Sequence, residues 1–170
     1  MKKIIVITFL VLSLGAGKSI AQGFDIDQWW VTFGIGNAFE GFKDGQRGLN
    51  MSGNINVHSG KYYYQIGLDD SGVPIFSDKT MGAIHFDVGQ CLITDYYMLT
   101  AFGGLGIMNY AYSDVNSKIQ NKPTIGINLN ANLTLKPLKL IGVSIEPYCN
   151  LRYRHTVSGI RLVLMLGDGI

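Results

Sequence analysis

Apolar and polar residues alternate along most of this chain, and the alternation is the first guide to its fold. The segment Thr124–Leu135, TIGINLNANLTL, shows it most clearly, with Ile, Leu or Ala at odd positions and Thr, Gly or Asn at even positions. Side chains of a β-strand point to its two faces in turn. A period of two over this length therefore predicts a strand with one apolar and one polar face.

Eight segments follow this pattern, and no stretch has a convincing helical period. They are Trp29–Phe39, Leu49–His58, Lys61–Asp69, Met81–Ile93, Tyr96–Tyr112, Thr124–Leu135, Ile141–Arg154 and Val157–Leu166. The fifth segment is rich in glycine and fits either phase. Pro147 lies inside the seventh and has no N–H to donate, so we expect a bulge or a local edge there. The pattern predicts an all-β fold of eight strands.

The connections between these segments alternate in length. Long loops, around residues 40–48, 70–80 and 113–123, follow the first, third and fifth segments, whereas short turns follow the second, fourth and sixth. The last connection, around His155, is also short. Outer-membrane barrels combine long external loops with short periplasmic turns in this way. A soluble meander has no physical reason to sort its loops by end.

Aromatic residues gather where the predicted strands end. One end carries Trp29, Trp30, Tyr62, Tyr64, Tyr96 and Tyr97, and the other carries Phe39, Tyr110, Tyr112 and Tyr153. Amphipathic rings are favoured where one edge is wet and the other is in lipid, so both groups are predicted to form aromatic girdles.

The distribution of charge indicates which face meets lipid. Every lysine after the first 21 residues falls in a predicted loop, turn or strand end, and the polar faces are mostly Asn, Ser, Thr and Gly. A soluble surface is usually about 25–35% charged. The few charged or titratable side chains on the polar faces are His85, Asp87, Glu146, Arg152 and Arg161. Because an unpaired buried charge is costly, we expect these five to form a network inside a barrel.

The N-terminus has the features of a secretory signal peptide. A basic start at Lys2 and Lys3 precedes a short apolar run and small residues before Gln22. This predicts a signal peptide at residues 1–21 and one domain at residues 22–170. Three basic residues leave with the signal, so the remainder carries 11 basic and 12 acidic residues, a net charge of −1. Nothing in this balance suggests a nucleic-acid partner.

No cofactor or metal site is expected. The three histidines have no ligand spacing. The two cysteines, Cys91 and Cys149, fall on opposite faces by the alternation, so we expect free thiols rather than a disulfide.

In strand pattern, loop alternation and aromatic girdles, residues 24–170 resemble the small eight-stranded outer-membrane β-barrels of Gram-negative bacteria, the OmpA/OmpX-like family. The resemblance implies a transmembrane up-and-down barrel, outer-membrane lipid around it, and insertion by the outer-membrane assembly machinery. It also implies a non-enzymatic role in adhesion, surface interaction or envelope integrity, with the three long loops available to an extracellular partner. Members usually end on an aromatic residue, whereas this sequence ends on Ile170.

Two other functions remain open. Some barrels of this kind modify the acyl chains of lipid A, and candidates here would be His155 and Ser158, oriented by Glu40 or Asp114. A soluble exported barrel of lipocalin type would instead bind an apolar ligand in its mouth. That alternative predicts an apolar interior and a charged exterior.

Overall fold

The computed structural model describes residues 26–40, 46–72, 79–113, 119–138, 140–152 and 155–167. The predicted signal peptide at residues 1–21 lies outside these ranges, as do Asp114 and Tyr153. The side chains of residues 46–47, 79–80, 110–113, 119–122, 136–138 and 155 are likewise outside the description.

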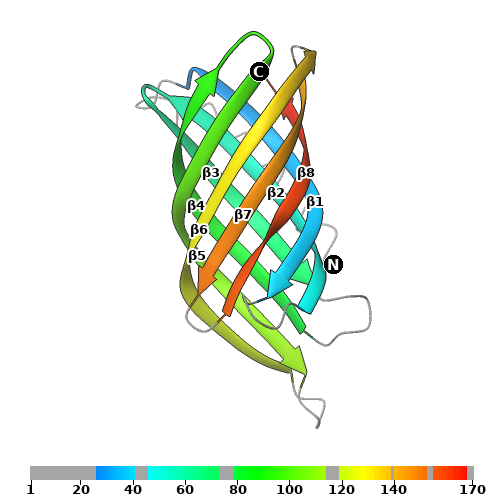
Figure 1. Cartoon of the computed structure of the whole chain (residues 1–170). Coiled ribbons are helices and arrows are strands. Elements are labelled where there is room, and N and C mark those ends of the chain that lie inside the picture. Colours follow the sequence, from blue (N-terminus) through cyan, green and yellow to red (C-terminus); the bar gives the residue numbers. More distant parts are fainter. Residues whose placement is uncertain are drawn as a thin grey trace, which may run out of the picture.

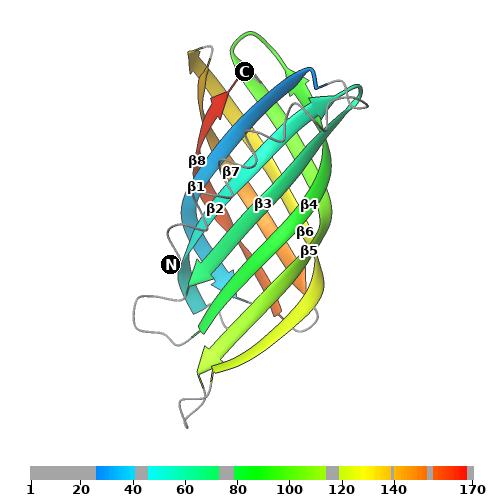
Figure 2. The same ribbon diagram turned by 180° about the vertical axis from the view of Figure 1, so that it is seen from behind.

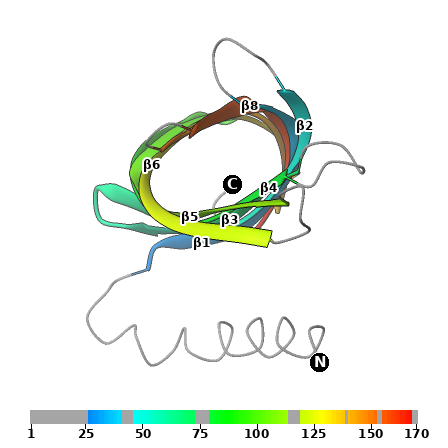
Figure 3. The same ribbon diagram turned by 90° about the horizontal axis from the view of Figure 1, so that it is seen from below.

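Eight strands form one closed antiparallel barrel, which confirms the predicted fold class. The strands are β1 (Gln28–Glu40), β2 (Gln46–Ser59), β3 (Tyr62–Gly72), β4 (Lys79–Ile93), β5 (Tyr97–Ser113), β6 (Ile119–Leu138), β7 (Ile141–Arg152) and β8 (His155–Gly167). Each pairs with the next, and β8 pairs with β1 (Figures 1 and 3). Closure leaves no edge strand, so every strand has hydrogen-bonding neighbours on both sides.

The connections after β2, β4 and β6 lie at one end of the barrel, together with the beginning of β1 and the end of β8 (Figure 2). Between β2 and β3, Gly60 adopts a φ of 63°, which only glycine accepts readily. Between β4 and β5, the Thr94 hydroxyl accepts a hydrogen bond from the Tyr97 N–H at 3.1 Å. We call this end the turn end, and the opposite end the loop end.

The β5–β6 hairpin extends farther at the loop end than the sequence predicted (Figure 1). The pairing runs from Tyr97 with Leu135 to Ser113 with Ile119, so residues 119–123 belong to a strand and not to a loop. Their polar composition hid this extension, because a strand that projects beyond the membrane does not need one apolar face.

Alternate side chains point to the lumen and to the outside, as period-two strands require. In β6, Ile125 is 74% exposed on the outer face, whereas Asn128 is fully buried on the inner face. All eight strands contribute large exposed apolar side chains to the outer face, including Phe33, Met51, Leu68, Phe86, Leu105, Leu129, Ile145 and Leu162. With an apolar exterior and a polar interior, the barrel is arranged for lipid outside. In the described ranges, no helix is long and apolar enough to cross a membrane.

Of the two effects expected at Pro147, the structure shows a local edge and not a bulge. Pairing between β6 and β7 lapses at this point, between the pairs Asn130–Tyr148 and Leu133–Ile145, but the register is the same on both sides. Pro147 still pairs with Ile160 on its other side. The missing N–H therefore interrupts one ladder without adding a residue. The register shift between β6 and β7 lies instead between Leu135 and Leu138, near the turn.

Candidate functional site

The lumen of the barrel has a polar middle between two apolar layers. Toward the turn end, Trp30, Tyr63, Met98, Phe102 and Met165 form one buried cluster. Toward the loop end, Ala38, Met81, Tyr148 and Val157 form another. An eight-stranded barrel is just wide enough for side chains to fill. The apolar layers therefore separate the polar middle from water at both ends.

Arg161 of β8 stands at the centre of the polar layer and is 1% exposed. Its guanidinium reaches Asp69 of β3 at 2.5 Å and Glu146 of β7 at 2.5 Å. It also lies over the ring of Tyr148, 4.1 Å from the centroid. Two carboxylates and an aromatic face thus surround one buried cation, the arrangement that makes burial of an arginine tolerable.

His85 of β4 connects a third carboxylate to this group. Its Nδ1 lies 2.7 Å from Asp87 Oδ2, and its Nε2 lies 3.8 Å from Asp69 Oδ2. The amide of Asn128 donates to Asp87 at 2.5 Å. All of these side chains are buried. The result is a continuous line of ionisable groups across the lumen, from Asp87 through His85 and Asp69 to Arg161 and Glu146.

Amide side chains extend the charged group across further strands. Asn50 accepts from Arg161 at 3.2 Å and donates to Ser71 at 2.7 Å. Asn150 donates to Asp69 at 3.1 Å. Asn130 donates to Gln65 at 2.9 Å, which links this region toward Asn56. Charges and amides together form what we call the lumen network, contributed by β2, β3, β4, β6, β7 and β8.

Inward-facing glycines provide the space that these side chains occupy. A Cβ at Gly67 would fall 2.2 Å from both His85 Cε1 and Asn54 Oδ1, and one at Gly104 would fall 2.5 Å from Asp87 Oδ1. A Cβ at Gly34 would similarly press on Ser52 and on Arg161. Packing to interior density leaves no room for these atoms. These glycines of the inner face are therefore needed for the side chains of the lumen network to fit.

The structure brings four of the five expected network residues together, and leaves one apart. His85, Asp87, Glu146 and Arg161 lie in the polar layer, but Arg152 is the last residue of β7 and donates to Thr124 at 2.9 Å, toward the loop end. Asp69 is central to the network and was missing from the expected set. It alternates with Gln65 and Gly67, so the pattern could have placed it inside.

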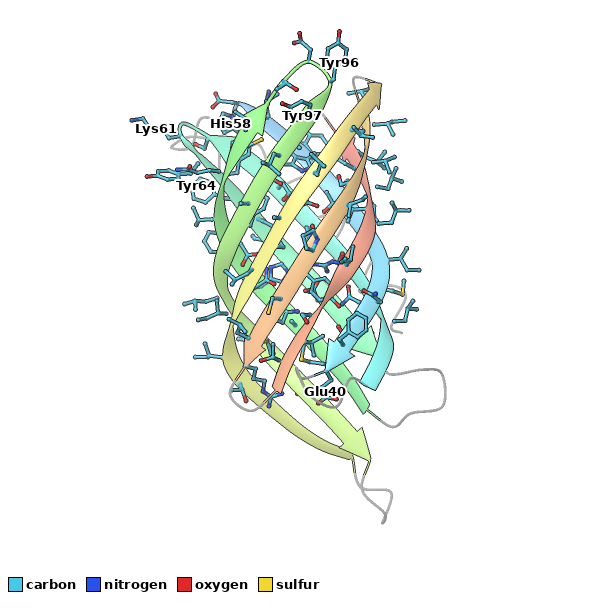
Figure 4. The ribbon with its side chains drawn as sticks, viewed as in Figure 1. Glu40, His58, Lys61, Tyr64, Tyr96 and Tyr97 are labelled. Atoms are coloured by element: carbon cyan, nitrogen blue, oxygen red, sulfur yellow. The ribbon has the colours of Figure 1, made fainter. Side chains whose placement is uncertain are left out.

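The aromatic residues separate by face as well as by level (Figure 4). Tyr96 is 80% exposed at the turn end, and Trp29, Tyr62, Tyr64 and Tyr97 lie at the same end on the outer side. The girdle assignment of Trp30 was wrong. It is 1% exposed in the lumen, because adjacent residues of a strand face opposite ways. At the loop end, Phe39 is half-buried, and the side chains of Tyr110 and Tyr112 are outside the description.

The candidates for lipid chemistry are not assembled in the part of the chain that the structure describes. Glu40 ends β1 and Ser158 lies in β8, where it pairs with Phe39. By strand alternation, Ser158 points outward and Glu40 inward. Cys91 and Cys149 are not joined by a disulfide, and Cys91 packs against the inner cluster at the turn end. Over the described ranges, no group of three or more His, Cys, Asp or Glu side chains could hold a metal ion.

A closed barrel of eight antiparallel strands with this inside-out polarity has the fold of the small eight-stranded outer-membrane β-barrels, and comparison with solved structures agrees. Neisserial surface protein A is similar with a TM-score of 0.71 at 8% identity, over 81% of this chain and 96% of that one. The match to Ail of Yersinia pestis, in complex with the heparin analogue sucrose octasulfate, has a TM-score of 0.57 at 11% identity, over 82% and 97%.

The outer-membrane enzyme PagL is also similar, with a TM-score of 0.50 at 11% identity, over 81% of this chain and 98% of that one. At such low identities, the likeness concerns the fold alone. No family model and no curated protein sequence matches the chain.

Proposed function

We propose that this protein is a non-enzymatic integral barrel of a Gram-negative outer membrane, exported through a cleaved signal peptide and inserted by the outer-membrane assembly machinery. The observation that carries the proposal is the filled lumen. A buried network of charges and amides occupies its middle, and apolar clusters close both ends. Such a barrel serves as a compact anchor, which leaves contact with the outside to the connections after β1, β3 and β5.

The role supported by this arrangement is adhesion, surface interaction or maintenance of the envelope. One structural neighbour, Ail, is an attachment and invasion protein by name. Both chain ends of the barrel lie with the short turns, so the longer connections all face one way. That side is the natural position for an extracellular partner.

An enzymatic alternative has one supporting observation, the likeness to the outer-membrane enzyme PagL. Against it, Ser158 and Glu40 point to opposite faces. The lipocalin-type alternative requires an apolar interior, whereas the middle of this lumen is polar and the outer face is apolar. A membrane-anchored, non-enzymatic barrel is consistent with both the apolar outer face and the polar lumen.

The proposal is tested by expressing the full chain in a Gram-negative host and fractionating the envelope. We expect the protein in the outer-membrane fraction, resistant to carbonate extraction. In planar bilayers the purified barrel should show no steady conductance, and labelled lipid A should keep all its acyl chains. Extraction by carbonate would contradict the membrane assignment, and released or transferred acyl chains would establish the enzymatic alternative.

A further inference from the structure

A hollow of about 550 Å³ interrupts the outer face across β2, β3, β4 and β5. Its apolar walls are Met51, Leu68, Ile84 and Ile107, one side chain from each strand. Leu68 lies four residues before the end of β3, and Ile84 lies five residues after the beginning of β4. The hollow is therefore in the half of the barrel toward the loop end.

Two glycines create this hollow, and packing does not require either of them. A Cβ at Gly53 would meet nothing within 4 Å, and one at Gly82 would meet only the Asp69 carbonyl oxygen at 3.9 Å. This contrasts with the lumen, where a Cβ at Gly67 would collide with His85. Glycine inside a strand weakens it, and often marks a close approach by a ligand or another backbone.

Polar groups stand along the outer edge of the hollow. Asp70 points outward from β3 and is exposed, and its cross-strand neighbours are Met51 and Gly82. Beyond Gly82 in the same row is Asn109, whose Oδ1 is buried and accepts no hydrogen bond from the side chains and backbone that the structure describes. One row nearer the turn end, the outer face is apolar, at Leu68, Ile84 and Ile107. The hollow thus spans the boundary between an apolar and a polar zone.

The chemistry of this edge calls for a donor with positive charge. An ionisable side chain on a lipid-facing surface is costly without a partner, and is a functional-site hypothesis by default. The Asp70 carboxylate and the Asn109 oxygen are both acceptors. An ammonium group supplies three donors and the opposite charge, and an acyl chain fits the apolar walls below it.

We propose that this hollow binds one lipid of the surrounding bilayer whose headgroup carries a primary ammonium. One acyl chain lies between Met51, Leu68, Ile84 and Ile107, over the bare backbone at Gly53 and Gly82. The ammonium donates hydrogen bonds to Asp70 and Asn109. The inference rests on the membrane-spanning role proposed above and adds to it a lipid class and a place.

The test uses the full barrel in nanodiscs of equal phosphatidylethanolamine and phosphatidylglycerol, with retained lipids counted by native mass spectrometry. The wild type should retain phosphatidylethanolamine in preference to phosphatidylglycerol. Asp70→Asn should reduce that preference roughly tenfold, the loss expected for one hydrogen bond to a charged group. Gly53→Leu with Gly82→Leu should abolish retention by filling the hollow. Gly72→Leu is the matched control, because Gly72 also has open space around it but does not line the hollow.

Three outcomes would overturn the inference. Equal retention by the wild type and the filled variant would show that the hollow holds no lipid. Equal retention of the two lipids by the wild type would refute the ammonium contact. If the wild type forms a dimer and the variant with the filled hollow does not, the hollow binds a second copy of the chain and not a lipid. A difference in gel mobility between unheated and boiled protein shows that each variant is folded. Failure of the wild type to enter nanodiscs would contradict the proposed membrane role, and not the lipid site alone.

Discussion

Arg161 is a permanently charged side chain buried in the lumen of the described barrel. Its guanidinium is shared by Asp69 and Glu146. The lumen network contains three carboxylates, one histidine and one permanent cation. The stability of the barrel therefore depends on keeping these partners together. Replacing one of them should lower the free energy of unfolding by an amount that depends on which charges are left unpaired.

Arg161→Met should destabilise the barrel by about 3–5 kcal/mol, because it leaves two buried carboxylates without their cation. Combining it with Asp69→Asn and Glu146→Gln should recover much of this loss, since neutral groups cost less to bury. Urea unfolding in lipid vesicles, followed by tryptophan fluorescence, gives the free energies. A triple variant no more stable than Arg161→Met would contradict the ion-pair explanation.

Gly67→Ala should cost about 1–3 kcal/mol by overpacking, because its new Cβ would fall 2.2 Å from His85 Cε1. Gly53→Ala is the matched control, since a Cβ there meets nothing within 4 Å. The same unfolding assay compares the two variants, with Trp30 as a reporter inside the lumen. Equal effects at both positions would show that glycine matters here through strand propensity and not through space.

At the scale of the strands, period-two alternation was enough to predict both faces. It placed the Ile and Leu row of β6 on the outer face and its asparagines in the lumen, as the structure shows. Alternation failed where it was not applied strictly: Trp30 was grouped with Trp29, and Asp69 was left unassigned. It could not predict which lumen groups touch, because Arg161 meets Asp69 across the barrel, and such contacts depend on closure and register.

Leu129→Arg should destabilise the barrel by about 2–4 kcal/mol, since Leu129 lies near the middle of the apolar row of β6. Leu135→Arg, on the same face but near the turn end, should cost only about 0–1 kcal/mol, because the penalty falls toward the interface. Unfolding in vesicles measures both. Similar costs at the two depths would argue against a membrane-spanning β6.

At the scale of the whole molecule, closure by β1 and β8 should make the barrel resistant to detergent. Unheated protein is expected to migrate on an SDS gel differently from boiled protein, because every strand is hydrogen-bonded on both sides. Gel mobility before and after boiling is the measurement. Identical mobility would indicate that the barrel does not survive SDS, and would weaken the case for a closed sheet.

The position of Arg161 in the last strand has a consequence for assembly. Asp69 belongs to β3 and Glu146 to β7, so the cation that pairs with both comes from a different strand, β8. A sheet that lacked β8 would have most of its lipid-facing surface and most of its ladders, yet two of its carboxylates would still need water. Its lumen could not yet become dry. Addition of β8 completes the hydrogen bonding and supplies the guanidinium that pairs with Asp69 and Glu146 in one event, which favours all-or-none closure over a stable, partly closed intermediate.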